Sequence, residues 1–252
     1  MRLSVILILC AQSLAAAPDV SLRPLARSDT VQVASVEPAL AAVRPVARRV
    51  SAASQSLRPF LRPKGLELQA MARRRERLEG SVCGDPDIQG TPVGAVPGRI
   101  RGCGISEGVK IRSVAGVGLT QDAVIDCGTA KALKSWVVNS AKPEFRSIGG
   151  GLSRLRVAAH YACRTRNNQP GAKLSEHGKG RAIDISGFIT QSGREVTVLQ
   201  GWNGSGTSRV MRAVHKGACG PFGTVLGPNS DRFHKDHFHF DTAQHRGGAF
   251  CR

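Results

Sequence analysis

None of the seven cysteines in this 252-residue chain belongs to a Cys-x-x-Cys pair. A four-thiolate zinc site and a thioredoxin-type redox motif usually contain such pairs, so neither is supported. Long apolar runs are also missing, because the stretch from Leu3 to Leu9 is far shorter than the ~20 residues of a membrane-spanning helix. The sequence therefore offers no thiolate centre and no membrane anchor for the mature chain.

Acidic residues are scarce, with 18 Asp and Glu against 36 Lys and Arg and a formal net charge of +18. In a cytosolic protein such a balance would favour nucleic acid as a partner. Here the charge is spread along the chain and accompanies no nucleic-acid-binding motif. We therefore expect no nucleic acid partner and interpret the charge as a solvated basic surface.

The first 17 residues, MRLSVILILCAQSLAAA, contain an early arginine, a short apolar run and a small-residue end. This order is typical of a secretory signal peptide, so we expect residues 1–17 to be removed and the protein to be secreted, in the periplasm. Removal leaves six cysteines, an even number that predicts up to three disulfides in an oxidising compartment. We expect Cys83 to pair with Cys251 and leave the other pairs open.

Residues 18–80 repeat an Arg-Pro theme, as in LRPLARS, VRPVARRV and LRPFLRPKG. Proline interrupts helices and strands, and the scattered apolar residues cannot form a core, so we expect a basic, disordered tether. A short helix around residues 66–78 fits within it. The folded domain is expected to span residues 81–252.

Two helices and four strands are expected in this domain. Helical spacing of apolar residues predicts a helix over residues 121–139, with Thr120 as its N-cap, and TSRVMRAVHKG predicts a second helix that ends at Gly217. Short β-rich runs are LRVAAHYAC, AIDISGF, EVTVL and HFHFD. Without a regular β-α alternation, this mixture predicts an α+β domain with a small central antiparallel or mixed sheet that carries the functional site and is flanked by helices.

Three of the seven histidines fall within HKDHFHFD, residues 234–241. Side chains alternate along a strand, so His237, His239 and Asp241 share one face while Phe238 and Phe240 point to the other. Imidazole nitrogen is a common zinc ligand, and a carboxylate on the same face can hold a ligating histidine in place. The alternative is a surface strand that carries unrelated histidines.

A second segment, SEHGKGRAIDISGF, supplies complementary groups. The carboxylate of Asp184 lies in an apolar strand, where it is costly unless it is paired or bound to a metal. Gly178 and Gly180 permit a sharp turn that brings His177 back over this strand. Two imidazole nitrogens and one carboxylate oxygen, with a fourth position open, are typical of catalytic zinc.

The segment SEHGKGRAID resembles the S-x-H-x-x-G-x-A-x-D motif of D-alanyl-D-alanine metallopeptidases and their lysostaphin and hedgehog relatives, and DHFHFD resembles their closing H-x-H motif. Together with CGI, DCGTA, YACRTRN and HKDHFHFD, these motifs resemble the bacterial extensin-like C-terminal domain family over about residues 81–252. The resemblance implies that His177, Asp184 and His239 bind Zn²⁺.

The resemblance also frames the choice of a general base. In relatives whose second motif ends in Glu-x-x-His, the glutamate is the general base. This chain has Asp236 at the corresponding position. His234 matches an additional histidine of penicillin-insensitive murein endopeptidases, and His237 lies two residues before the last ligand. We rank His237 before His234 and His234 before Asp236, because strand alternation turns Asp236 to the opposite face.

In relatives, an arginine upstream of the first metal ligand binds a carboxylate of the substrate. This chain has Arg164 and Arg166 in that region. Arg164 fits better, because it directly follows the run YAC. The resemblance therefore implies an exported zinc peptidase that hydrolyses amide bonds of peptidoglycan stem peptides or cross-links. The alternatives are a non-catalytic cell-wall-binding or structural domain that keeps zinc for stability and, less favoured, a basic protein that binds exported DNA or lipopolysaccharide.

Overall fold

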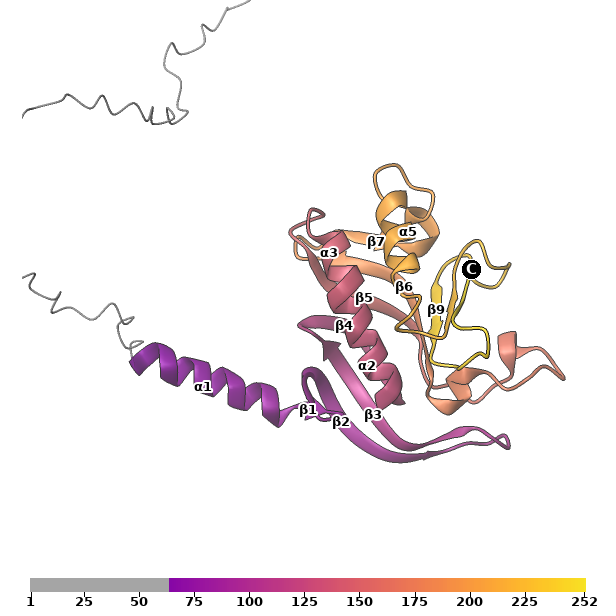
Figure 1. Cartoon of the computed structure of the whole chain (residues 1–252), viewed down its shortest axis with the longest axis horizontal. Coiled ribbons are helices and arrows are strands. Elements are labelled where there is room, and N and C mark those ends of the chain that lie inside the picture. The colour runs from indigo at the N-terminus through magenta and orange to yellow at the C-terminus, as the bar shows by residue number, and fades with distance from the viewer. Residues whose placement is uncertain (1–63) are drawn as a thin grey trace, which may run out of the picture. The chain divides into compact units, whose positions relative to one another are not determined.

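A mixed sheet of ten strands dominates residues 64–252, the part of the chain that this computed structural model describes (Figure 1). The strands are β1 (Ser81–Val82), β2 (Asp85–Pro97), β3 (Gly104–Val114), β4 (Val117–Asp126), β5 (Leu152–Ala159), β6 (Ala182–Thr190), β7 (Glu195–Thr197), β8 (Thr224–Leu226), β9 (Phe238–Asp241) and β10 (Phe250–Cys251). Their order is β1-β2-β3-β4-β5-β6-β9-β8-β10, with β7 paired to β6. The predicted α+β class with a mixed sheet is confirmed, and the sheet is larger than expected.

Most neighbouring strands are antiparallel, whereas β4 pairs with β5 and β8 with β10 in parallel. The helices are α1 (Lys64–Glu79), α2 (Cys127–Trp136), α3 (Lys142–Phe145), α4 (Val198–Gly201) and α5 (Ser208–Lys216). A π-helical turn, η1 (Val137–Ala141), joins α2 to α3, and two 3₁₀ turns are η2 (Arg166–Asn168) and η3 (Glu176–Lys179). Among residues 64–252, no helix is both long enough and apolar enough to cross a membrane.

The hydrophobic core lies between the sheet and the helices α2 and α5. Trp136 of α2 packs edge-on against Phe240 of β9, with ring centroids 5.0 Å apart. Its indole Nε1 donates a hydrogen bond to the Val214 carbonyl oxygen of α5 at 2.8 Å. Because side chains alternate along β6 and β9, one face of these strands fills the core and the other is left for polar groups.

The helix predicted over residues 121–139 starts too early. Residues 121–126 belong to β4, where Ala123 and Ile125 are fully buried, as strand alternation requires. The helix α2 begins at Cys127, and the Asp126 carboxylate caps it by accepting a hydrogen bond from Thr129 N at 2.7 Å. The predicted cap at Thr120 is therefore wrong, because β pairing with β3 overrides the local helical spacing.

Other boundaries also differ from the predictions. In the run EVTVL, the strand β7 ends at Thr197 and the helix α4 follows. In the run LRVAAHYAC, the strand β5 ends at Ala159, before His160. No element was predicted for the β2–β3 hairpin. The second predicted helix corresponds to α5, with Thr207 and Gly217 at its ends.

The predicted signal peptide and the tether up to residue 63 lie outside the described residues. The last part of the predicted tether is the helix α1, which contains the expected helix at 66–78 and so corrects the prediction of disorder there. The first strand begins directly after it, at Ser81.

Residues 64–252 contain three disulfides: Cys83–Cys127, Cys103–Cys163 and Cys219–Cys251. The expected number is confirmed, but the pairing of Cys83 with Cys251 is wrong. The reason is the strand order, which places β1 and β10 at opposite ends of the sheet. Such cross-links are consistent with an extracellular or secreted protein.

Candidate functional site

The polar face of β6 and β9 carries the centre of the site. Asp184 and His239 are directly opposite each other in the antiparallel register of these strands. Their neighbours Ile183 and Phe240 form another opposed pair and are fully buried in the core. The predicted alternation of histidines and phenylalanines is confirmed.

His177 reaches the same face from the turn η3. The turn begins at Ser175, whose hydroxyl accepts a hydrogen bond from His177 N at 3.4 Å, and ends at Gly180 with φ of +68°. A side chain at Gly180 would also lie within 2.3 Å of Ile105, so only glycine fits there. The sharp turn predicted from the glycines therefore places His177 over β6.

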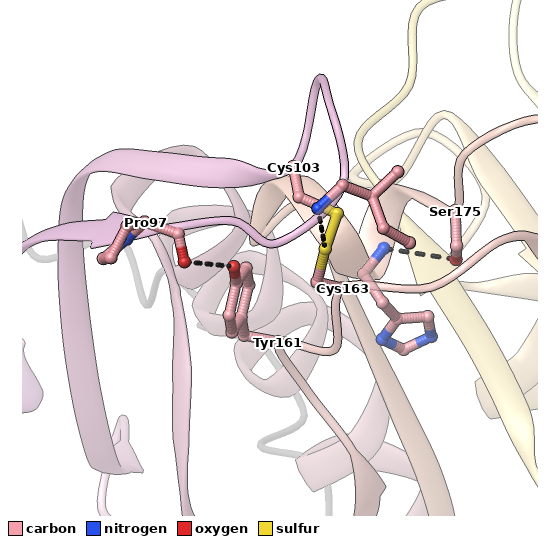
Figure 2. The surroundings of a disulfide bond; sticks show 7 residues. Pro97, Cys103, Tyr161, Cys163 and Ser175 are labelled. Atoms are coloured by element: carbon pink, nitrogen blue, oxygen red, sulfur yellow. Dashed lines mark hydrogen bonds between the residues drawn. A yellow bond between two sulfur atoms is a disulfide. The ribbon is translucent and has the colours of Figure 1, made fainter.

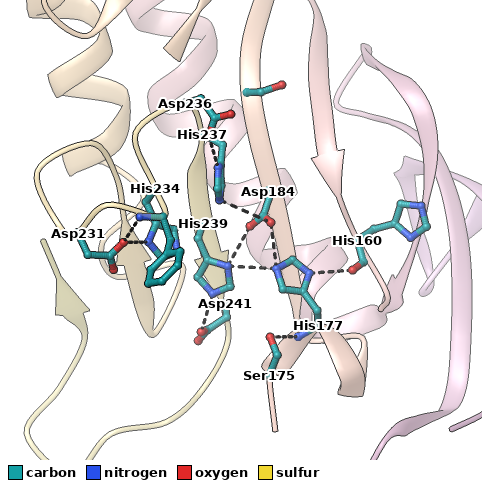
Figure 3. A network of polar contacts seen from close by, with 12 residues as sticks. His160, Ser175, His177, Asp184, Asp231, His234, Asp236, His237, His239 and Asp241 are labelled. Atoms are coloured by element: carbon teal, nitrogen blue, oxygen red, sulfur yellow. Dashed lines mark hydrogen bonds and ion pairs between the residues drawn. The ribbon is translucent and has the colours of Figure 1, made fainter. Parts of the chain in front are cut away.

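Three side chains converge at the base of this face (Figure 3). Asp184 Oδ2 lies 3.1 Å from His177 Nε2, and Asp184 Oδ1 lies 2.9 Å from His239 Nδ1. The two imidazole nitrogens are 3.2 Å apart. One ligand atom from each residue lies within 4.8 Å of the others, so this nitrogen and oxygen donor set fits a divalent metal such as zinc.

The outer nitrogens of both histidines are also engaged. His177 Nδ1 donates to the carbonyl oxygen of His160 at 2.7 Å, which leaves Nε2 to face Asp184. His239 Nε2 lies 3.0 Å from Asp241 Oδ2. Hydrogen bonds of this kind fix the orientation of metal-binding imidazoles.

His239 and Asp184 shift each other's pKa values. Burial disfavours the charged form of His239, but hydrogen bonds to Asp184 and Asp241 outweigh burial and raise the pKa of His239 to about 9. Burial alone would raise the pKa of Asp184, whereas hydrogen bonds from His177 and His239 lower it well below its usual range. Asp184 is therefore a carboxylate at neutral pH, which is the form that binds a cation.

Two further histidines lie next to this cluster, and each is held by an aspartate. His237 Nδ1 is 2.8 Å from Asp236 Oδ1, and its Nε2 is 3.8 Å from Asp184 Oδ2. His234 Nδ1 is 2.8 Å from Asp231 Oδ1. Burial lowers the pKa of His234 although Asp231 opposes this shift, so a neutral ring with a free Nε2 is favoured there.

A cleft of about 830 Å³ is lined by the three converging side chains, by His234, His237 and Asp231, and by the predicted Arg164 and Arg166. Arg164 is half-buried and Arg166 is exposed. Among residues 64–252, neither guanidinium forms an ion pair. Both cations are therefore available to an acidic ligand in the cleft.

A family model described as extensin-like protein C-terminus matches residues 90–252, which is more than half of the chain. The chain belongs to this family. No curated protein and no solved structure matches the chain significantly. The family thus identifies the domain over residues 90–252.

Asp236 of this extensin-like domain lies apart from the cleft. Its side chain is 68% exposed and borders a shallow hollow beside Arg156 and Ser186. Its carboxylate touches the site only through His237 Nδ1. This placement suits an orienting group for His237.

Two parts of the extensin-like cleft were missed by the sequence analysis. Asp231 orients His234 through a hydrogen bond. Its position three residues before His234 is the feature of the sequence that indicates this contact. The segment from His245 to Phe250 forms a wall of the cleft, where His245 Nε2 lies 2.9 Å from Thr224 Oγ1. This wall had no local signal, because it depends on the parallel pairing of β10 with β8.

Proposed function

We propose that this extensin-like domain is an exported, zinc-dependent peptidase that hydrolyses amide bonds in peptidoglycan stem peptides or cross-links. The observation that carries the proposal is the convergence of His177 Nε2, Asp184 and His239 Nδ1 at the base of the cleft. It is supported by the resemblance of the two metal-binding motifs to those of D-alanyl-D-alanine metallopeptidases. The periplasm is the proposed location.

His177, Asp184 and His239 would hold the metal through two nitrogens and one carboxylate oxygen. Zinc in such a site supplies Lewis-acid chemistry, which polarises a scissile carbonyl and makes water a better nucleophile. The hydrogen bonds to the His160 carbonyl and to Asp241 keep the two imidazoles oriented.

His237 is proposed as the group that moves the proton. Its Nδ1–H is held by Asp236, so Nε2 has the free lone pair and points toward Asp184. In this position it would accept a proton from the attacking water and return it to the leaving amine. His234, which is oriented by Asp231 in the same way, is the second candidate.

Arg164 is proposed to bind a carboxylate of the substrate. A planar guanidinium forms two parallel hydrogen bonds to a carboxylate, and partial burial strengthens them. Stem peptides carry several carboxylates, so a cleft lined by two arginines suits them. Arg166 at the exposed rim would add attraction without fixing the geometry.

Digestion of purified sacculi tests the proposal. Native protein is expected to release new muropeptide ends, to lose this activity with a chelator and to regain it with zinc. Metal analysis should give about one zinc per chain, and His239→Ala should lose it. A protein that sediments with sacculi but releases no product from D,D- or L,D-cross-linked material would be a wall-binding domain.

A further inference from the structure

The disulfide Cys103–Cys163 joins the tip of the β2–β3 hairpin to the segment that follows β5 (Figure 2). Cys103 lies directly before β3, and Cys163 follows β5 and directly precedes Arg164. The loop around the cross-link is further held by Ile100 N, which lies 3.3 Å from Cys163 Sγ, and by the Tyr161 hydroxyl, which donates to Pro97 O at 3.2 Å. The hairpin tip is thus attached to the segment that carries the proposed substrate-binding arginine.

The same cross-link lies against the turn that carries His177. A methyl group added at the Gly178 Cα would approach Cys103 Sγ to 3.0 Å, so the sulfur packs directly on the residue after His177. On the other side, Ala162 N donates to His177 O at 3.2 Å and Ser175 N donates to Arg164 O at 3.1 Å. These bonds connect the residues around Cys163 to the first half of the turn, at Ser175 and at His177.

Regular structure contributes little to this part of the cleft. Between the end of β5 at Ala159 and the start of β6 at Ala182, the chain forms only two 3₁₀ turns and one isolated bridge, Thr165 with Leu174. Because this segment is not paired with the sheet as a strand, its position relative to the sheet depends on single backbone hydrogen bonds, such as those of Tyr161 N with Val124 O and of Asp126 N with Gly180 O, and on the covalent cross-link. The cross-link thereby excludes conformations that strand pairing would exclude elsewhere.

We propose that Cys103–Cys163 is a positioning cross-link, which sets His177 for metal binding and Arg164 for substrate binding. This inference rests on the proposed function, because it assumes that His177 is a metal ligand. Its consequence is that breaking this disulfide weakens metal binding far more than breaking a cross-link elsewhere in the domain.

The matched control is Cys83–Cys127, which joins the β1–β2 turn to the start of α2. Neither of its cysteines directly precedes a residue that lines the cleft, whereas Cys163 directly precedes Arg164. The two cross-links span similar separations of 60 and 44 residues, so loop-closure entropy predicts similar losses of stability. A difference in metal affinity between the two disulfide variants would therefore reflect the position of the cross-link and not a general loss of stability.

The experiment compares Cys103→Ser/Cys163→Ser with Cys83→Ser/Cys127→Ser in the full mature chain. Zinc affinity is measured by competition with a chromophoric chelator, and the visible spectrum of the Co²⁺-loaded protein reports the ligand geometry. We expect zinc affinity to fall by about 10- to 100-fold with a changed Co²⁺ spectrum in the first variant, as for other groups that orient metal ligands, and by less than about threefold in the control.

Gly178→Ala provides a second test if the disulfide variant fails to fold. It keeps every cysteine but presses a methyl group on Cys103 Sγ, so we expect weaker zinc binding, whereas Gly65→Ala meets no neighbour and should bind zinc normally. The effect of Gly178→Ala should shrink when Cys103 and Cys163 are serine, because the smaller oxygen leaves more room.

The outcomes separate the two claims. Unchanged zinc affinity and Co²⁺ spectrum in both Cys103→Ser/Cys163→Ser and Gly178→Ala, with normal binding by native protein, would overturn the positioning role alone. Equal losses in the two disulfide variants would also overturn it. Native protein that binds neither zinc nor Co²⁺ would overturn the proposed function and this inference with it.

Discussion

The carboxylate of Asp241 lies 3.0 Å from Nε2 of His239 and thereby turns Nδ1 of the same ring toward Asp184. Both residues belong to β9, two positions apart, so strand alternation alone puts them on one face. The buried carboxylate makes His239 a more basic ligand and holds the ring in one orientation.

Asp241→Asn tests this relationship. The amide keeps the shape of the side chain but removes its charge, so we expect zinc affinity to fall about tenfold or more. Chelator competition measures the change. Asp122→Asn is the control, because Asp122 is exposed on β4, away from the site, and pairs with Lys110 at 3.7 Å. Equal affinities in both variants would show that Asp241 does not support the metal ligand.

His237→Ala should retain zinc, because His237 is not one of the three proposed ligands, yet it should lose cleavage of cross-linked muropeptides. Loss of a general base costs on the order of 10²- to 10⁴-fold in rate. Asp236→Asn should cost less, because the imidazole would remain and only its orientation would weaken. Turnover that survives His237→Ala but disappears in His234→Ala would assign the proton transfer to His234.

Arg164→Ala is expected to raise KM for muropeptides that carry a free carboxylate, while zinc content and thermal stability stay unchanged. Removing a charge-assisted pair of hydrogen bonds costs about 1.5–3 kcal/mol, which corresponds to about a 10- to 100-fold loss of kcat/KM. Arg164→Lys should restore only part of it, because an ammonium lacks the planar fork. Arg166→Ala is the comparison, with a smaller, salt-sensitive effect.

His215 on α5 predicts an acid-sensitive core. Burial lowers its pKa from the ordinary value of 6.5, against the opposing effect of carbonyls of Leu226 and Arg252, and its ring packs on Trp202 and Phe238. The folded state therefore favours the neutral ring. Below about pH 6.5 the unfolded state binds more protons than the folded state, so the free energy of unfolding decreases as the pH is lowered.

One such group contributes a slope of up to about 1.4 kcal/mol per pH unit in the free energy of unfolding. Chemical denaturation of metal-free protein between pH 7 and pH 4 measures it. His215→Leu should have a shallower acid slope than the native chain, whatever its stability at neutral pH. An identical slope would contradict a buried, neutral His215 as a source of acid sensitivity.

The sequence by itself determined the parts of the site that depend on local geometry. Alternation in HFHFD placed His239 and Asp241 on one face and Phe238 and Phe240 on the other, because side chains of a strand repeat every two residues. Gly180 indicated the turn of His177 for a similar reason, since a positive φ favours glycine.

The tertiary structure decided what depends on the order of distant strands. It placed β1 and β10 at opposite ends of the sheet, too far apart for a bond between Cys83 and Cys251. It also converted residues 121–126 from an expected helix into β4, and it brought the C-terminal segment beside β8 as a wall of the cleft. These features arise from pairing and burial between segments far apart in the chain, which local spacing does not encode.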